Sequence, residues 1–243
     1  MKNRLLVCLM LFFFAATAFG CARREAGREA KKEVTKEERI TLNVEGKELT
    51  ISDIASKQIK ASSPAEQTEA KEFKEFVVYR DKRYVKNHYI PSGWMGDVGD
   101  IKFNDNCKDD PQSGYTCIEV GYTGKCSQNA GWAGVYWQNP ANNWGMIKGG
   151  YDLTGAKKLT FWARGKEGGE VISEFKMGGI TGEYSDSDSA SIGPVELTNS
   201  WKQYTIDLEG MDLSYISGGF CWVISRIYND QGCTFYLDEI KYE

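Results

Sequence analysis

Histidine and proline are scarce in this chain of 243 residues, which contains one histidine, His88, and 5 prolines. A single histidine excludes a metal site built from several histidines and argues against catalysis by a histidine base. No G-x-S-x-G nucleophile motif occurs, and no spacing singles out the two carboxylates that glycoside hydrolysis requires. The composition therefore predicts that the protein is not an enzyme.

An excess of basic residues is also missing. The chain has 30 Lys and Arg against 34 Asp and Glu, a net charge of -4 and a pI near 5.3. Domains that bind nucleic acid present a basic face, so no nucleic-acid partner is expected. The seven cysteines include no C-x-x-C spacing, which argues against a cysteine metal site.

The N-terminus carries a targeting segment. Lys2 and Arg4 precede an apolar run over residues 5–16, and small residues follow, as in a signal peptide over residues 1–20. The run is too short to span a membrane comfortably as a helix. Export is therefore expected, and it makes the cysteines of the mature chain candidates for disulfides.

The residues around the cleavage point, Ala18-Phe19-Gly20-Cys21, resemble a bacterial lipobox, with Ala18 where that motif usually has leucine. The resemblance implies that Cys21 becomes the lipid-modified N-terminus of a lipoprotein, anchored in a lipid bilayer of the cell envelope. Ala22 in the next position is compatible with sorting to the outer membrane of a host with two membranes. The alternative is ordinary signal cleavage, which releases a soluble secreted form.

Five cysteines remain after Cys8 leaves with the signal peptide and Cys21 takes lipid: Cys107, Cys117, Cys126, Cys221 and Cys233. An odd number leaves one thiol free or the pairing incomplete. Cys107 and Cys117 flank a short polar turn, and we predict a disulfide between them. Cys221 and Cys233 fall on two consecutive predicted strands, where a simple hairpin would not bring them face to face.

The linker between the signal peptide and the main domain is expected over residues 21–75. Residues 22–39 alternate charged residues with alanine and lack an apolar stripe, so they predict a tether. Residues 40–51 alternate apolar and polar residues around Glu45-Gly46 and predict a small hairpin. Ser63-Pro64-Ala65-Glu66 has the residues of a helix start and predicts a short helix through about Glu75.

Residues 76–243 are predicted to form one all-β domain, an antiparallel β-sandwich. Short runs rich in β-branched and aromatic residues, bounded by turn residues, predict strands at 76–81, 101–105, 116–123, 131–138, 158–165, 170–178, 201–208, 219–227 and 233–242. Residues 87–100 are rich in glycine and polar residues and predict a loop. Period-two alternation with no long helix is typical of a sandwich.

The runs YDLTGAKKLTFWARG, WKQYTIDL, GGFCWV and TFYLDEIKYE resemble, in this order, the galactose-binding-domain-like jelly roll. Many carbohydrate-binding modules have that fold. The resemblance implies a non-catalytic domain that binds polysaccharide or another glycan. The same fold also serves in protein contacts, so a structural or assembly lipoprotein with an envelope protein as partner is the alternative. A glycan-active enzyme is the third possibility.

The resemblance also implies a structural calcium ion as cofactor. Jelly rolls of this kind often hold calcium with an aspartate of the last strand, and Asp238 in FYLDEI matches it. Asp97 and Asp100, with Asp105 nearby, are the further candidates. Calcium takes six to eight oxygen ligands at about 2.3–2.6 Å, so backbone carbonyls would have to contribute. The alternative is that Asp97 and Asp100 form Asx-turns and Asp238 a surface pair.

The stretch 131–150, GWAGVYWQNPANNWGMIKGG, combines three tryptophans with amide side chains. Aromatic rings stack on the C–H faces of sugars and amides bond their hydroxyls. The predicted ligand-binding residues are Trp94, Trp132, Tyr136, Trp137, Asn142, Asn143 and Trp144. A strand over 131–138 would project Trp132 and Tyr136 from one face and Trp137 from the other. One of these sets must then line the core, so the loop 139–145 is the preferred part of the site.

Overall fold

The computed structural model describes residues 42–44, 47–49 and 73–243. The predicted signal peptide, the lipidated Cys21 and the tether lie outside the described residues. So does the predicted helix, apart from residues 73–75, which are not helical. No helix in the described ranges has the length and hydropathy to cross a membrane.

A small hairpin forms where the sequence predicts one. Strand β1 (Leu42–Val44) pairs antiparallel with β2 (Lys47–Leu49), with Leu42 opposite Leu49. The two strands flank the Glu45-Gly46 step on which the prediction rests.

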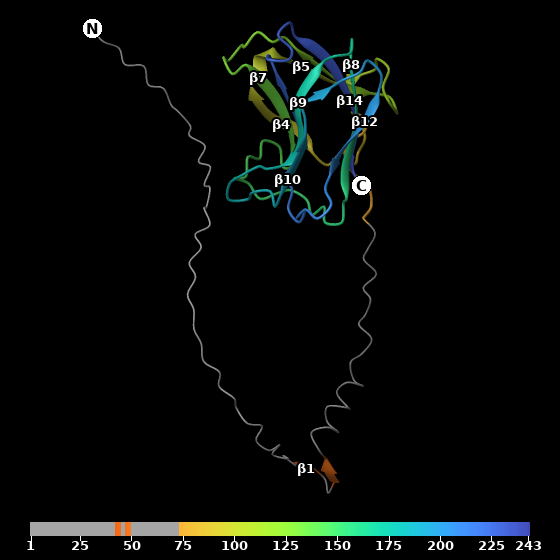
Figure 1. The fold of residues 1–243 in the computed structure, drawn as a ribbon, viewed down its shortest axis with the longest axis vertical. Helices are drawn as coiled ribbons and strands as arrows, with labels where there is room; N and C mark the ends of the chain where they lie inside the picture. Colours follow the sequence, from red (N-terminus) through yellow and green to blue (C-terminus); the bar gives the residue numbers. More distant parts are fainter. Residues whose placement is uncertain (1–41, 45–46, 50–72) are drawn as a thin grey trace, which may run out of the picture. The chain divides into compact units, whose positions relative to one another are not determined.

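The main body of the protein, residues 73–243, is a sandwich of two antiparallel sheets (Figure 1). Sheet I has the strand order β10-β9-β13-β7-β4, with β11 also paired to β9. Its strands are β4 (Ile90–Gly96), β7 (Trp132–Gln138), β9 (Val171–Gly178), β10 (Ser189–Ile192), β11 (Val195–Glu196) and β13 (Gly218–Ser225). The predicted all-β sandwich of jelly-roll type is confirmed.

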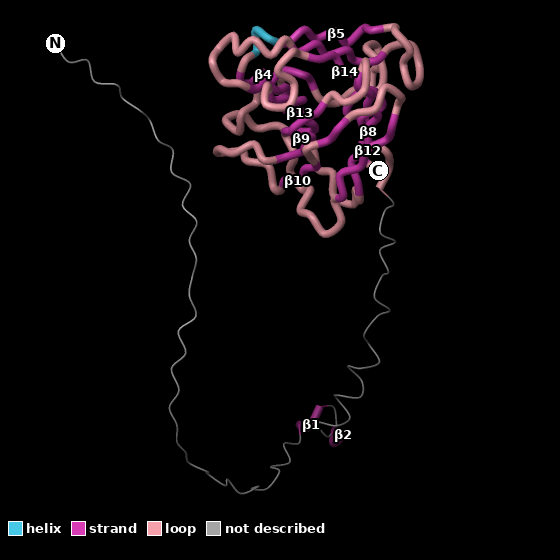
Figure 2. The backbone as a smooth tube through the Cα atoms, turned by 45° about the horizontal axis from the view of Figure 1, so that its top comes forward, coloured by secondary structure: helices cyan, strands magenta, loops and turns pink. Residues whose placement is uncertain are grey.

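Sheet II has the order β12-β8-β14-β6-β5, with β3 paired to β14. Its strands are β3 (Phe76–Tyr79), β5 (Ile101–Cys107), β6 (Cys117–Tyr122), β8 (Lys158–Gly165), β12 (Lys202–Asp207) and β14 (Cys233–Tyr242). A single turn of 3-10 helix, η1 (Val98–Asp100), leads into β5 and is the cyan segment of Figure 2.

The core lies between the sheets and follows the two-residue period of the strands. In β8, Leu159, Phe161 and Ala163 are fully buried, as their alternation predicts. Trp137 from β7 packs edge-to-face on Phe220 with ring centroids 5.4 Å apart. Burial of side chains of this size contributes roughly 1.5–3 kcal/mol each to folding. The sandwich is therefore a well-packed scaffold that holds the side chains on the outer faces of its two sheets in place.

The sequence prediction fails at the edges of sheet I. Residues 87–100 are predicted as a loop, yet β4 occupies part of them and pairs with β7. An edge strand tolerates Pro91, because one side of its backbone makes no ladder bonds. Gly93 is required there, since a Cβ would stand 2.8 Å from the Cβ of Tyr136. The short edge strands β10 and β11 are likewise not predicted, because four and two residues are too few to show the alternation of a strand.

The predicted cysteine pair lies in register. Cys107 of β5 is the cross-strand partner of Cys117 of β6, and both are buried. Both are free thiols in the structure, so the covalent bond stays a prediction. Cys221 and Cys233 belong to different sheets, which corrects the expectation of a hairpin between their strands.

Candidate functional site

The outer face of sheet I presents an aromatic strip that follows β7. Along this strand Val135 and Trp137 point into the core, while Trp132 and Tyr136 point outward. Trp132 keeps 38% of its surface exposed, whereas Tyr136 is 5% exposed and donates its hydroxyl to the Gly178 carbonyl at 2.8 Å. The predicted division of these rings between two faces is confirmed.

A second exposed tryptophan extends this strip beyond the end of β7. Trp144 lies in the loop after the strand, and its ring meets that of Tyr136 edge-on at a centroid distance of 6.0 Å. It is 42% exposed. Tyr136 therefore forms a floor between two exposed rings, Trp132 on one side and Trp144 on the other.

The position between Trp132 and Tyr136 is a glycine, Gly134. A Cβ added there would lie 2.7 Å from the Trp222 carbonyl oxygen, 3.1 Å from Met95 Cε and 3.3 Å from Val223 Cγ2. Met95 and Val223 are partly exposed and pack beside Tyr136. The strip is thus smooth and apolar along its middle, with no side chain rising from β7 between the rings.

Polar side chains lie on the same outer face on β9 and β10, which follow β13 in the order of sheet I. Lys176 of β9 holds its Nζ 5.8 Å from the centre of the Tyr136 ring. Glu174 is the cross-strand partner of Val223, and Ser191 of β10 is the partner of Lys176. Neither Lys176 nor Glu174 forms an ion pair among residues 73–243. Lys176 therefore reaches the aromatic strip, and Glu174 and Ser191 continue the same face away from it, all with hydrogen-bonding capacity to spare.

The loop that carries Trp144 is held from inside by Asn143. This side chain is fully buried, and it donates to the carbonyls of Asn139 at 3.2 Å and Ile147 at 2.8 Å. Its Oδ1 accepts from the amides of Gly145 at 3.0 Å and Ile147 at 3.2 Å. Asn143 thus fixes the loop and has no free group for a ligand, so its prediction as a binding residue is wrong.

Two further predicted ligand-binding residues are placed elsewhere. Trp137 is 1% exposed in the core, so it is not a ligand contact. Trp94 is 39% exposed, but it is the cross-strand partner of the inward-facing Val135 and packs edge-on against Phe103 at 5.6 Å. It therefore stands at the rim of the sandwich and not on the outer strip. Asn142 is exposed beside Trp144 and is compatible with a binding role.

The three aspartates predicted to bind calcium are not gathered into one site. Asp238 lies on the outer side of sheet II, where its side chain accepts hydrogen bonds from the backbone amides of Gln112 at 3.0 Å and Ser113 at 3.2 Å. Asp97 precedes η1 and Asp100 is its last residue, near the end of β14 that begins at Cys233. Five residues of strand separate Cys233 from Asp238, about 17 Å at 3.3–3.4 Å per residue. No cluster of three metal-ligating side chains occurs in the described part of the chain, so these residues do not fit a shared calcium ion.

Asp97 has a structural role that its surroundings explain. Its side chain is buried and accepts the backbone amides of Gln128 at 2.7 Å, Ala130 at 3.0 Å and Gly131 at 2.7 Å. Burial alone would raise the pKa of Asp97, but these amide donors hold its pKa below the usual value. The carboxylate thus positions the turn that leads directly into Trp132.

At Asp238 the effect of burial on the pKa outweighs that of the amide donors. Burial raises the pKa of Asp238 to about 7, against the lowering effect of the amides of Ser113, Glu239 and Gln112. Its role is to hold the loop after β5 against sheet II.

His88 is a structural residue. Its ring stacks on Phe76 at a centroid distance of 3.9 Å, and Nδ1 lies 2.8 Å from the Val77 carbonyl oxygen. The ring therefore has a packing role on the Phe76 side of sheet II, and nothing in its surroundings marks it as a catalytic base.

Sequence reasoning missed the polar and aliphatic border of the strip. The sequence predicts a loop at Met95, and at Val223, Lys176 and Glu174 it predicts only that the residues belong to strands. Their two-residue alternation with buried neighbours marks them as outward-facing. It does not say which of the two outer faces they share, because the strand order is not contained in the alternation.

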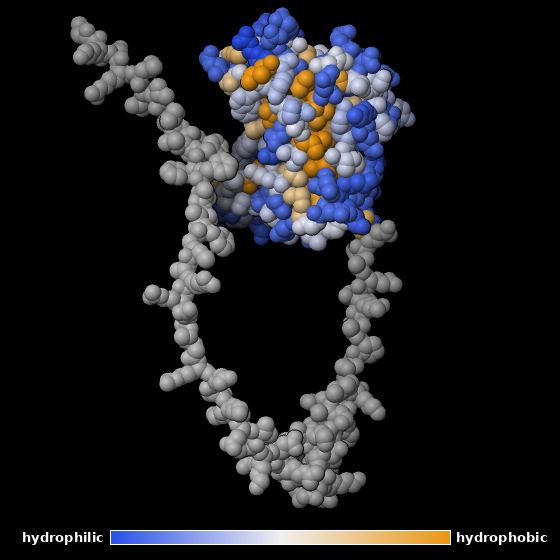
Figure 3. All heavy atoms as spheres, viewed as in Figure 1, coloured by the Kyte–Doolittle hydropathy of each residue, from blue (hydrophilic) through white to orange (hydrophobic). Residues whose placement is uncertain are grey.

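Exposed large apolar side chains are few on the main body of the protein. Figure 3 shows one face, on which hydrophilic residues predominate and a band of hydrophobic residues runs between them. The exposed large hydrophobic residues are Val85, Ile90, Trp94, Val98, Tyr115, Trp132, Trp144, Met146, Ile147, Ile227 and Tyr228. Three of them, Trp144, Met146 and Ile147, fall in the loop beside Tyr136, which adds to the apolar character of that end of the strip.

Comparison with known proteins yields matches among solved structures. No family model matches the chain, and no curated protein matches it. The family 30 carbohydrate-binding module of a cellulosomal cellulase of Clostridium thermocellum is similar at 16% identity and a TM-score of 0.48, covering 70% of this chain and 97% of that one.

Two other modules show a similar relation. The family 11 carbohydrate-binding module of Clostridium thermocellum, in complex with a β-1,3-1,4-mixed-linked tetrasaccharide, matches at 16% identity and a TM-score of 0.47, over 69% of this chain and 94% of that one. A mutant of the family 29 carbohydrate-binding module CBM29-2 matches at 10% identity and a TM-score of 0.40, over 70% of this chain and 91% of that one. These are likenesses of fold. The ligand-binding residues of this chain have to be inferred from its own surface.

Proposed function

We propose that the outer face of sheet I binds a polysaccharide and that the domain has no catalytic activity of its own. The observation that carries this proposal is the pair of exposed tryptophans, Trp132 and Trp144, at the two ends of one smooth strip. Flat apolar rings stack on the C–H faces of sugar rings. On the same outer face, Lys176, Glu174 and Ser191 of β9 and β10 supply donors and acceptors for hydroxyls.

The length of the strip favours a chain of sugars over a single unit. Trp132 and Tyr136 are four residues apart on an extended strand, about 13 Å, and the Trp144 ring lies a further 6.0 Å from that of Tyr136. A ligand that contacts both tryptophans must therefore extend over several rings.

The affinity expected from this face is modest. An aromatic contact contributes about 0.5–1.5 kcal/mol beyond the burial of area. Two such rings with a few neutral hydrogen bonds correspond to a dissociation constant in the micromolar range or weaker. Such binding suits a module that holds a polymer through repeated contacts.

We further propose that the domain is displayed at the cell envelope. The support is the sequence at the N-terminus, where the lipobox-like residues 18–21 place Cys21 for lipid attachment and residues 22–75 provide a spacer. A lipid-anchored domain would then hold glycan close to the membrane surface. Mass spectrometry of the purified mature protein tests the anchor, since a lipid-modified Cys21 at the N-terminus is expected.

Affinity electrophoresis through gels that contain soluble polysaccharides tests the binding face. The full chain should be retarded by at least one polysaccharide, and Trp132→Ala should lose roughly three- to tenfold in affinity. Trp94→Ala is a matched control, because Trp94 and Trp132 are 39% and 38% exposed but only Trp132 lies on the strip. Equal losses in both variants would contradict the assignment. Absence of retention on every glycan would favour a protein partner.

A further inference from the structure

The outer face of sheet II, on the other side of the sandwich from the aromatic strip, carries a hollow of about 450 Å³. Trp162 of β8 borders it, between its cross-strand partners Gln203 of β12 and Asp238 of β14. Gln112 and Arg80 line other parts of the hollow. Its volume lies within the range of about 300–1,000 Å³ that is usual for small-ligand sites.

Two other aromatic residues of this face, Tyr236 and Trp201, already have partners in the protein. Arg164 lies 3.8 Å from the centre of the Tyr236 ring and 5.2 Å from that of Trp201. The Trp201 indole donates to the Asp110 carbonyl at 2.8 Å, under the loop after β5. Trp162 borders the hollow instead, half-buried, and has no aromatic stacking partner within residues 73–243.

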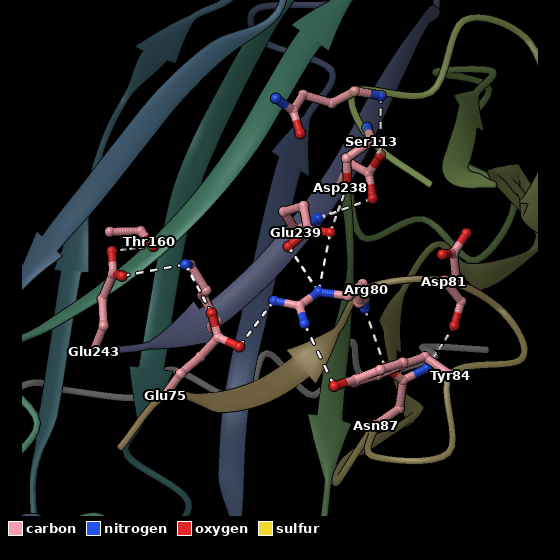
Figure 4. Close-up of polar contacts among 12 residues, drawn as sticks. Glu75, Arg80, Asp81, Tyr84, Asn87, Ser113, Thr160, Asp238, Glu239 and Glu243 are labelled. Carbon is pink, nitrogen blue, oxygen red and sulfur yellow. Dashed lines mark hydrogen bonds and ion pairs between the residues drawn. The ribbon is translucent and has the colours of Figure 1, made fainter. Parts of the chain in front are cut away.

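A rigid polar frame surrounds the hollow (Figure 4). Arg80 Nε donates to both carboxylate oxygens of Glu239, at 3.1 and 3.0 Å, and its Nη2 donates to Glu75 at 2.9 Å. Ser113 Oγ donates to Glu239 at 2.6 Å, and Lys241 Nζ donates to Glu75 at 2.9 Å. Three separate segments of the chain are thereby fixed relative to one another, so the hollow is largely pre-formed.

Several groups at the hollow retain hydrogen-bonding capacity. The side-chain amides of Gln112 and Gln203 have no hydrogen-bond partner among residues 73–243, although the backbone of Gln112 is anchored to Asp238 at 3.0 Å. A guanidinium has five N–H donors, and the bonds of Arg80 use Nε and one donor on each terminal nitrogen. An amide pairs well with a hydroxyl because it offers both a donor and an acceptor.

The charges that line the hollow balance. Arg80 and Lys241 contribute two positive charges, and Asp81 and Glu239 contribute two negative ones. All four already have hydrogen-bond partners within the protein. The hollow therefore offers a ligand no net opposite charge, whereas a neutral ligand rich in hydroxyls can use both the spare donors and the spare acceptors.

We infer that this hollow is a second binding site, for a single neutral sugar unit. The ring of Trp162 receives the C–H face of the sugar, and the amides of Gln112 and Gln203 with the spare donors of Arg80 bond its hydroxyls. The inference stands on side chains that the strip on sheet I does not share. With both sites occupied, one domain would contact two glycan segments on opposite faces.

Nuclear magnetic resonance titration of the 15N-labelled full chain tests the second site. The probes are methyl β-D-glucoside, methyl β-D-galactoside and methyl α-D-mannoside, with glucuronate as the charged comparison. The indole N–H signal of Trp162, identified by its loss in Trp162→Phe, should shift with at least one neutral glycoside. Gln203→Ala should weaken this response roughly two- to tenfold. Thr205→Ala, exposed on the same strand, should leave it unchanged.

The possible outcomes separate this inference from the proposed function. Shifts confined to residues of sheet I would overturn the second site and leave the polysaccharide-binding strip intact. A response of Trp162 to glucuronate alone would overturn the assignment to neutral sugars. A response at Trp162 with none on sheet I would support the second site, and it would leave the strip untouched, because the strip is proposed to bind a chain of sugars and not a single unit. If Gln203→Ala and Thr205→Ala weakened binding equally, the assigned contacts would be wrong.

Discussion

The replacement Asn143→Ala separates residues that hold the binding loop from residues that touch its ligand. Asn143 makes four hydrogen bonds to the backbone of its own loop, and its side chain is fully buried. Alanine would leave the amides of Gly145 and Ile147 without these acceptors. A neutral hydrogen bond contributes about 0.5–1.5 kcal/mol net, so the variant should lose about 3 kcal/mol of unfolding free energy.

Thermal unfolding followed by circular dichroism measures this loss. For a domain of this size, 1 kcal/mol corresponds to about 2–4 °C in Tm, so a fall of roughly 6–12 °C is expected. Asn142→Gly is the matched control: Asn142 is exposed, and its φ of 59° suits glycine. Its Tm should stay within about 2 °C of wild type, since surface replacements usually change stability by less than about 0.5 kcal/mol.

Binding assays complete this comparison. Trp144→Ala should weaken retention on polysaccharide roughly three- to tenfold while leaving Tm nearly unchanged. Asn143→Ala should lower both, because the loop that positions Trp144 is lost. If Asn143→Ala kept its Tm and lost only binding, Asn143 would be a ligand contact after all and the reasoning from its burial would be refuted.

Three further predictions concern stability. The pKa of Asp97 is lowered in the folded state, so its contribution to the unfolding free energy is present above its ordinary pKa of 3.8 and is lost as pH falls through the folded pKa. Asp97→Asn should therefore lower the unfolding free energy at neutral pH, and in urea unfolding the difference from wild type should shrink in acid. A difference that stays constant with pH would contradict this. If Cys107 and Cys117 are oxidised in the exported protein, intact-mass analysis should show a loss of two hydrogens. Cys117→Ser should then lower the unfolding free energy by about 3 kcal/mol, for a closed loop of roughly ten residues. If both thiols react with an alkylating reagent in protein unfolded without reductant, the bond is excluded. Chelation with EDTA should leave Tm unchanged, because Asp97, Asp100 and Asp238 are not gathered around one ion; a fall of several degrees would restore the calcium prediction.

The sequence predicts the sandwich well because its core strands show their two-residue period locally. Leu159, Phe161 and Ala163 alternate with Thr160, Trp162 and Arg164, and the structure buries all three at the core. Edge strands carry less of this signal, since one side of their backbone is unpaired and their residues need not be apolar. That is why β4, with Pro91 and its glycines, was predicted as a loop.

The candidate site was predicted only in part, for a different reason. Alternation along β7 correctly separates Trp132 and Tyr136 from Trp137. Whether a polar loop residue points inward is decided by the path of the loop, and the buried Asn143 and the exposed Trp144 are neighbours in sequence. Which strands flank β7 is set by the topology, so Val223 and Lys176 could not be assigned to the strip.

Mapping a bound oligosaccharide onto the domain tests the central claim most directly. In a 15N-labelled protein titrated with an oligosaccharide of the polysaccharide that retards it, the largest amide shifts should fall at Gly134, Tyr136, Lys176 and Val223, together with the indole signals of Trp132 and Trp144. Shifts that leave these positions unchanged while saturating elsewhere would contradict binding on the outer face of sheet I.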